Sequence, residues 1–169
     1  DLGKIHHLKI ENDTIFSFSP VYFTPEIDTL FADYPKIDFE EIWFDKQTNN
    51  VYLSVEGNGP TPLKYTSIFK LTFNHGNIFA DTVVAIQKLD INPAGQFNNY
   101  VKNNLGFEGA AVDENYFYFG FEGFFENGIF GDSTIIYIVD KKNLKIVKEI
   151  NTKPLGIHTI CGLYSDENY

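Results

Sequence analysis

The chain has 169 residues, enough for one domain with a core of its own, and its net charge of -10 reflects 23 acidic residues against 13 lysines, with no arginine. Such a chain lacks the basic surface that binding to nucleic acid or to an anionic membrane requires. An acidic surface suits metal cations or cationic ligands, although solubility alone accounts for it. No apolar run approaches the roughly 18 residues of a membrane span. Aromatic residues make up 17% of the chain, which favours β-strands.

From the N-terminus, residues 5–19 are typical of a β-hairpin, and residues 25–31 predict no more than one short helical turn. Residues 39–57 then alternate apolar with other side chains at the strand period of two, on both sides of a polar turn at residues 45–50. This stretch predicts a second hairpin.

Another strand pair, residues 65–73 and 78–89, follows directly and completes a set of four antiparallel strands. The same order returns later in the chain. Residues 107–123 predict a hairpin with a tighter turn, and residues 134–139 and 144–150 predict the strand pair after it.

The recurring units also share individual amino acids at the same positions. Residues 39–57 and 107–123 both begin with Phe-Glu, carry Asp five residues after that Glu, and end in Glu-Gly. Residues 107–123 and 160–169 share a Gly followed, after three residues, by Asp-Glu-Asn-Tyr. Four antiparallel strands per recurring unit predict the blades of a β-propeller. A β-sandwich is the rival, but it accounts for the strands and not for the recurrence.

We therefore predict an all-β fold, a partial β-propeller of about three four-stranded antiparallel blades in a single domain. Complete blades are expected at residues 39–90 and 106–152, part of one at residues 1–38 and the start of another at residues 158–169. Closed propellers have about four to eight blades, so we expect residues 1–169 to be an incomplete ring. More of the same chain or a protein partner would complete it.

Within this recurring unit, the motifs resemble those of the bacterial family named "esterase-like activity of phytase". Its members carry an Asp-x-Glu stretch that leads to a Ser-x-Glu-Gly strand end, here residues 38–42 and 54–57. Further on they carry a motif similar to residues 104–111, and then another acidic strand end, here Glu122-Gly123. The resemblance covers most of residues 5–169, about half of such a protein. It implies a phytase-like propeller with bound calcium.

Four glutamates are the candidate metal ligands. Glu40 and Glu108 occupy the same place in two blades, at the start of the innermost strand, where carboxylates of successive blades converge on one axis. Glu56 and Glu122 end the second strand of each hairpin and so reach the same face. Calcium, a hard cation that takes about six to eight oxygen ligands, is the cofactor we expect. The alternative is that each glutamate accepts hydrogen bonds from backbone N–H groups of the neighbouring blade.

Cys161 stands in the third copy where the first two have glutamate, and it departs from the pattern because a thiol is a poor calcium ligand. As the single cysteine it allows neither an intrachain disulfide nor a thiolate zinc site. We expect a buried, inert thiol, with a reactive nucleophile as the alternative.

Two functions follow. We expect an exported protein, secreted, periplasmic or at the cell surface, that acts as a binding or scaffold module with the aromatic-rich residues 121–130 as its contact surface. The alternative is a calcium-dependent hydrolase that acts on a small-molecule phosphate or carboxylic ester. The sequence has no Gly-x-Ser-x-Gly nucleophile motif and offers no arginine to hold phosphate groups.

Overall fold

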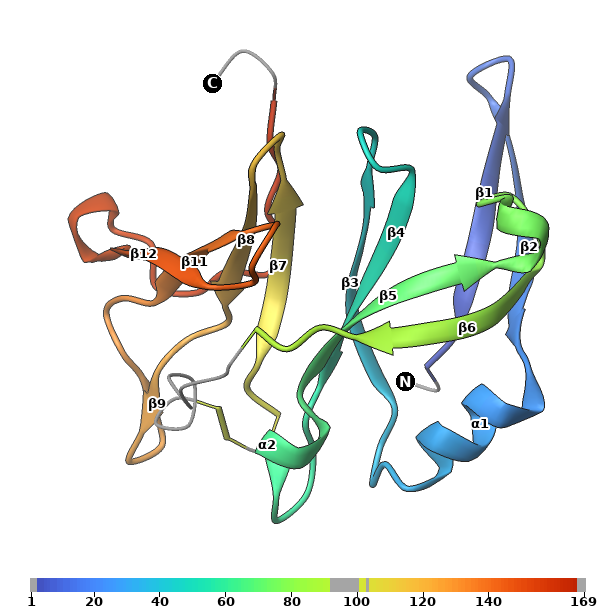
Figure 1. Cartoon of the computed structure of the whole chain (residues 1–169). Coiled ribbons are helices and arrows are strands. Elements are labelled where there is room, and N and C mark those ends of the chain that lie inside the picture. The colour runs from blue at the N-terminus through green and yellow to red at the C-terminus, as the bar shows by residue number, and fades with distance from the viewer. Residues whose placement is uncertain (1–2, 92–100, 103, 167–169) are drawn as a thin grey trace.

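The protein is all-β, with a few short helices between the strands (Figure 1). The structure is a computed structural model that describes residues 3–91, 101–102 and 104–166. Two large sheets form the molecule, and a short hairpin projects from the second. In the described part of the chain, no helix is long and apolar enough to cross a lipid bilayer.

Four consecutive antiparallel strands form one side of the first sheet, with β3 at its edge: β3 (Asp38–Asp45), β4 (Asn50–Glu56), β5 (Ser67–Phe73) and β6 (Thr82–Lys88). They occupy the stretch in which the sequence predicts a four-stranded unit. β5 and β6 are shorter than expected, because the short helix α2 (Pro62–Tyr65) precedes β5 and a 3₁₀ turn, η1 (Asn74–Gly76), follows it.

The predicted N-terminal hairpin consists of β1 (Ile5–Glu11) and β2 (Ile15–Phe23) and extends this sheet to six strands in the order β1-β2-β6-β5-β4-β3. The end of β2 pairs in parallel with β6, through Tyr22 opposite Thr82 and Phe23 opposite Val83. The hairpin thus lies at the outer edge of the first sheet and pairs with it directly.

The helix α1 (Pro25–Ala32) follows β2, so the prediction of no more than one short turn here is wrong. Proline at the first position and the acidic Glu26 and Asp28 in the first turn favour a helix start. Ile27 and Phe31, four residues apart, lie on one buried face. Burial of this face against the sheet stabilises a helix too short to persist alone.

Four strands in antiparallel succession also form the second sheet, in the order β12-β11-β8-β7: β7 (Phe107–Val112), β8 (Tyr116–Phe121), β11 (Ile135–Asp140) and β12 (Ile146–Asn151). Between β8 and β11 the chain forms the small hairpin of β9 (Phe125–Glu126) and β10 (Ile129–Phe130). The 3₁₀ turn η2 (Lys153–Leu155) follows β12.

An aromatic layer joins the two sheets. Trp43 and Tyr52 of the first sheet stack with ring centres 5.5 Å apart, and each also meets a ring of the second sheet. Tyr52 contacts Phe117 at 5.0 Å and Trp43 contacts Phe119 at 5.8 Å, both edge to face. All four side chains are buried. The closest backbone approach between the sheets is that of β3 and β4 to β7.

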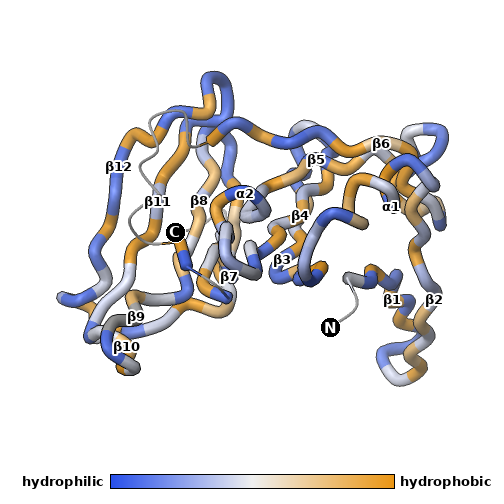
Figure 2. The backbone as a smooth tube through the Cα atoms, turned by 90° about the horizontal axis from the view of Figure 1, so that it is seen from below, coloured by the Kyte–Doolittle hydropathy of each residue, from blue (hydrophilic) through white to orange (hydrophobic). Residues whose placement is uncertain are grey.

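The other face of the first sheet is also buried, because the sheet curves and carries α1 on its concave side (Figure 2). Leu53 and Val55 of β4 pack there against Phe31 of the helix and Val21 of β2. Tyr52 points to the opposite, aromatic layer. β4 is therefore buried on both faces, which is why its residues after Asn50 are all inaccessible to solvent.

The C-terminal residues 160–166 run beside β7 and β8 (Figure 1). The Ile160 backbone N–H donates to the Glu122 carbonyl at 3.0 Å, and the Ser165 hydroxyl donates to a carbonyl of β7 at 2.6 Å. The close approach requires glycine at position 120, where a Cβ would lie 2.5 Å from Cγ2 of Ile160. This segment thus lies against β7, and Gly162 also comes near the Glu41 side chain of β3.

A buried ion pair also links the two sheets. Lys141 Nζ lies 2.7 Å from the Asp45 carboxylate, with the two side chains only 10% and 2% exposed. The same ammonium donates to the Asp113 carbonyl at 2.9 Å. The pair therefore ties the hairpin turn of the first sheet to that of the second.

We expect Lys141→Met to destabilise the protein by about 3 kcal/mol, because it leaves the Asp45 carboxylate buried without its cation. Urea unfolding followed by circular dichroism measures this loss. The matched control is Lys153→Met, which breaks the Asp132–Lys153 pair, whose side chains are 63% and 65% exposed. That change should cost far less, because exposed ion pairs contribute little to stability. Equal losses in the two variants would contradict this account of the interface.

Candidate functional site

The predicted glutamates Glu40 and Glu108 lie at equivalent irregularities of the two sheets. In β3 the pairing with β4 shifts between Phe39 and Ile42, so that Glu40 and Glu41 face a single residue of β4. In β7 the pairing with β8 shifts between Phe107 and Gly109, at Glu108. Each shift is a β-bulge, which bends the strand and changes the direction of its side chains. Strands β3 and β7 therefore each carry a bulged glutamate near their start.

Glu56 and Glu122 lie at the opposite ends of the partner strands and so come close to the bulges. Glu56 is the last residue of β4 and pairs across the ladder with Asp38. Glu122 directly follows β8, and its backbone N–H donates to the Gly106 carbonyl at 2.9 Å. The antiparallel hairpin brings its first and last residues together, as the sequence predicts.

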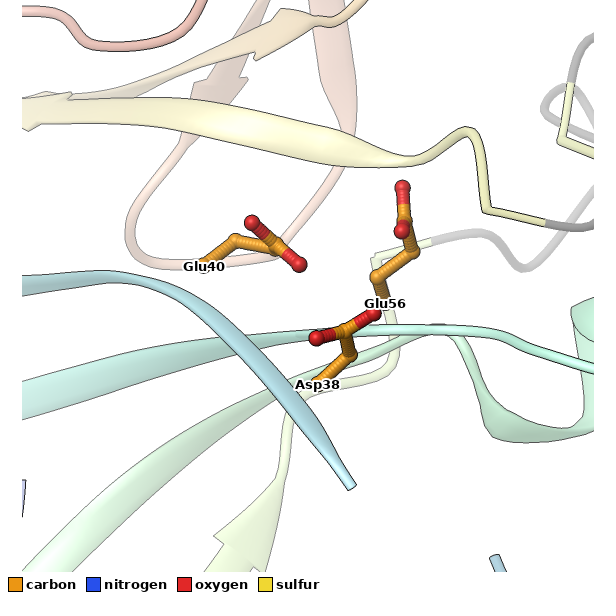
Figure 3. A group of neighbouring side chains, drawn as sticks. All are labelled: Asp38, Glu40 and Glu56. Carbon is orange, nitrogen blue, oxygen red and sulfur yellow. The ribbon is translucent and has the colours of Figure 1, made fainter. Parts of the chain in front are cut away.

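All four predicted glutamates belong to two groups of carboxylates that share Glu56. Asp38, Glu40 and Glu56 form the first group, and Glu56, Glu108 and Glu122 form the second. In each group one carboxylate oxygen per residue lies within 4.8 Å of the others. Figure 3 shows the side chains of the first group gathered at the start of β3.

Asp38 is the member that the sequence analysis did not select. It lies two residues before Glu40 in a strand, and residues at this spacing point to the same side of a sheet. The Asp-x-Glu spacing was therefore a usable signal. What the sequence could not supply was the burial of Asp38 together with Glu56.

Glu56 is the most deeply buried member of the cluster, with 1% of its surface exposed. Neither of its carboxylate oxygens has a hydrogen-bond partner, and Oε2 of Glu122 is buried without one as well. Gly106 packs directly on Glu56, since a Cβ at that position would lie 3.4 Å from Oε1. The backbone N–H bonds that we considered as an alternative to a metal are therefore not made to Glu56.

Asp38 differs from Glu56 because its carboxylate is partnered. Its Oδ2 atom accepts a hydrogen bond from the amide of Asn58 at 3.2 Å and forms an ion pair with Lys36. Both contacts use the same oxygen, which leaves Oδ1 for a further ligand.

The electrostatics of the cluster favour protons or cations. Burial, and then the charges of Glu40 and the other acids, raise the pKa of Glu56 to about 8. Burial followed by the charge of Asp38 raises the pKa of Glu40 to about 7. Burial, with the charge of Glu108, raises the pKa of Glu122 to about 7. A cation bound among these carboxylates would relieve the same repulsion that raises these pKa values.

Cys161 also lies beside the cluster, but it is exposed, so the expectation of a buried thiol is wrong. A hydrogen bond with the Glu108 side chain, then burial and the surrounding acids, raise the pKa of this thiol. Because the thiolate is the nucleophilic form, a raised pKa makes Cys161 a poor nucleophile. The thiol stays outside because residues 160–166 turn Ile160 inward, against Gly109 and Gly120.

Two further features bear on binding. In the aromatic-rich stretch 121–130, Phe121 is buried, whereas Ile129 and Phe130 at the tip of the β9–β10 hairpin are 72% and 43% exposed. A cavity of about 790 Å³ runs between β3, β7 and residues 163–166, toward the hairpin turns rather than toward the carboxylates. The cavity and the acidic cluster are thus separate features of the same two strands.

Comparison with protein-family models, with curated proteins and with solved structures yields no match to this chain. The phytase-like family therefore stays a prediction, as do calcium and the ligand role of the four glutamates.

The raised pKa values predict how stability changes with pH when no metal is bound. An unfolded Glu56 ionises near pH 4.5, and the folded carboxyl near pH 8. Between these values the folded protein keeps a proton that the unfolded chain releases, so stability falls as pH rises. A loss of about 2 kcal/mol between pH 5 and pH 8.5 would lower the melting temperature by roughly 4–8 °C.

Thermal melts in metal-free buffers measure this decline, and Glu56→Gln is the informative variant. Its neutral amide should reduce the decline and make the metal-free protein more stable than the original at pH 8.5. Asp45 and Asp113, whose pKa values are lowered, lose their contribution only below about pH 4. A melting temperature that stays constant or rises from pH 5 to pH 8.5 would contradict the raised pKa of Glu56.

Proposed function

We propose that this chain is part of an exported β-propeller that acts as a binding or scaffold module and holds calcium where its innermost strands begin. The propeller is supported by two four-stranded meanders with the same strand order and with bulges at the same place. It is also supported by the contact of β3 with β7 and by residues 160–166, which lie against β7 in turn. Blades that succeed one another around an axis have this arrangement.

One observation carries the proposed calcium site: a glutamate that is 1% exposed has no partner for either oxygen and lies among four other carboxylates. Leaving an ionised carboxylate buried and unpaired is costly, and a cation is the natural compensation. Two oxygens on opposite sides of a calcium ion lie roughly 4.6–5.2 Å apart. Three oxygens within 4.8 Å of one another can therefore share one ion.

In this proposal calcium has a structural and a binding role. Glu40 and Glu56 belong to the first sheet, and Glu108 and Glu122 to the second. An ion held among Glu56, Glu108 and Glu122 would cross-link the two sheets. The exposed Ile129 and Phe130 offer an apolar contact for a protein partner or for a further part of the chain.

The catalytic alternative, a calcium-dependent hydrolase, stays a prediction. A screen of generic phosphate and carboxylic esters with and without calcium tests it, and calcium-dependent turnover lost in Glu56→Gln would replace the binding role by a catalytic one.

Calcium should stabilise the metal-free protein by mass action. At a calcium concentration 100 times the dissociation constant, the expected gain is about 2.7 kcal/mol, or a rise in melting temperature of roughly 5–10 °C. Differential scanning calorimetry at pH 8 with and without calcium measures this rise. Glu56→Gln should abolish it, because the amide removes the charge at the centre of the cluster.

The matched control is Glu149→Gln, the same change on an exposed position of β12. This variant should keep the full calcium response. A melting temperature that calcium leaves unchanged in the original protein would refute the calcium site, and an equal loss of response in both variants would refute the role of Glu56.

A further inference from the structure

The two groups of acidic residues have one residue in common. Asp38 and Glu40 form one group with Glu56, and Glu108 and Glu122 form the other with it. Glu56 is common to both, and each of its two oxygens lacks a hydrogen-bond partner. A carboxylate with two free oxygens can bind one cation with each.

We propose that the cluster binds two divalent cations side by side, with the Glu56 carboxylate as the bridge between them. This inference rests on the calcium site proposed above and adds its stoichiometry and the identity of the bridging residue. One cation lies among Asp38, Glu40 and Glu56, and the other lies among Glu56, Glu108 and Glu122.

Burial distinguishes Glu56 from an ordinary member of an acidic cluster. A surface carboxylate finds water, but Glu56 is 1% exposed and Gly106 covers it. Its carboxyl group is therefore buried, belongs to both groups of acids and has no hydrogen-bond partner to satisfy it. Two cations, one at each oxygen, would satisfy both atoms.

The charges of the cluster agree with two cations. The two groups together hold five carboxylates, and among the described residues the ion pair that reaches them is that of Lys36 with Asp38. Ionised, the cluster thus keeps four negative charges beyond that pair, which two divalent cations neutralise and one does not. Asp38 can bind a cation and keep its pair with Lys36, because Lys36 and Asn58 contact only its Oδ2 atom and leave Oδ1 available.

The open coordination positions also follow from this geometry. Calcium takes about six to eight oxygen ligands, and each ion here has three carboxylates, one of them shared. Each ion therefore keeps room for water or for oxygens of an anionic ligand.

The experiment is a count of bound calcium. Metal-free protein is titrated with calcium at pH 8 by isothermal titration calorimetry, and native mass spectrometry gives the number of ions per chain. We expect two ions in the original protein, one in Glu40→Gln and one in Glu122→Gln, with the affinity of the remaining site within about tenfold. Glu56→Gln should lose both, whereas the control Glu149→Gln should keep two.

A second probe tests adjacency without any substitution. The protein is loaded with one equivalent each of Tb³⁺ and Eu³⁺, and energy transfer from Tb³⁺ to Eu³⁺ should shorten the Tb³⁺ emission lifetime if the two sites share Glu56. Far-ultraviolet circular dichroism shows whether each variant is folded. If Glu56→Gln fails to fold, two results still test the bridge. These are the loss of one bound ion in each of Glu40→Gln and Glu122→Gln, and the Tb³⁺ lifetime.

The outcomes separate the two proposals. No bound calcium in the original protein would refute the calcium site itself. A single ion, lost equally in Glu40→Gln and Glu122→Gln, would keep the calcium site and refute the bridge. Two ions without energy transfer would place them apart and would also refute the bridge.

Discussion

The contact between the edge strands β3 and β7 of the two sheets is the constraint on which the rest of this structure depends. Each strand begins with a bulged glutamate and continues into a buried hairpin, so their close approach brings two acidic strand starts together. The aromatic layer of Trp43, Tyr52, Phe117 and Phe119 holds that approach by burial of large apolar surface. The Asp45–Lys141 pair fixes the other end of the same strands.

In this arrangement apolar packing stabilises the fold, whereas the buried acidic side chains destabilise it. Packing of the sheets stabilises the fold, but it also removes Glu56 from water and crowds it with other acids. Folding without a cation is then easiest when Glu56 carries a proton. The cluster is thus where the stability of the protein becomes sensitive to pH, while the hydrophobic layers on either side of β4 carry no such charges.

Much of the architecture was readable from local patterns. The period-two alternation and the polar turns located the strands that became β3 to β6, β7, β8, β11 and β12, but not the short β9 and β10. The repeated Phe-Glu placed Glu40 and Glu108 at equivalent strand starts. Antiparallel hairpin geometry then brought Glu56 and Glu122 to the same end. These features follow from the strand repeat and from turn chemistry, both of which act over a few residues.

Other features exist only because distant segments meet. The helix at residues 25–32 forms because the curved sheet buries Ile27 and Phe31, and Cys161 stays exposed because Ile160 occupies the space beside Gly120. The sequence by itself determined which residues become strands and which glutamates repeat. The tertiary structure alone decided that Glu56 would be buried without a partner, since burial and charge crowding depend on the packing of one sheet on the next.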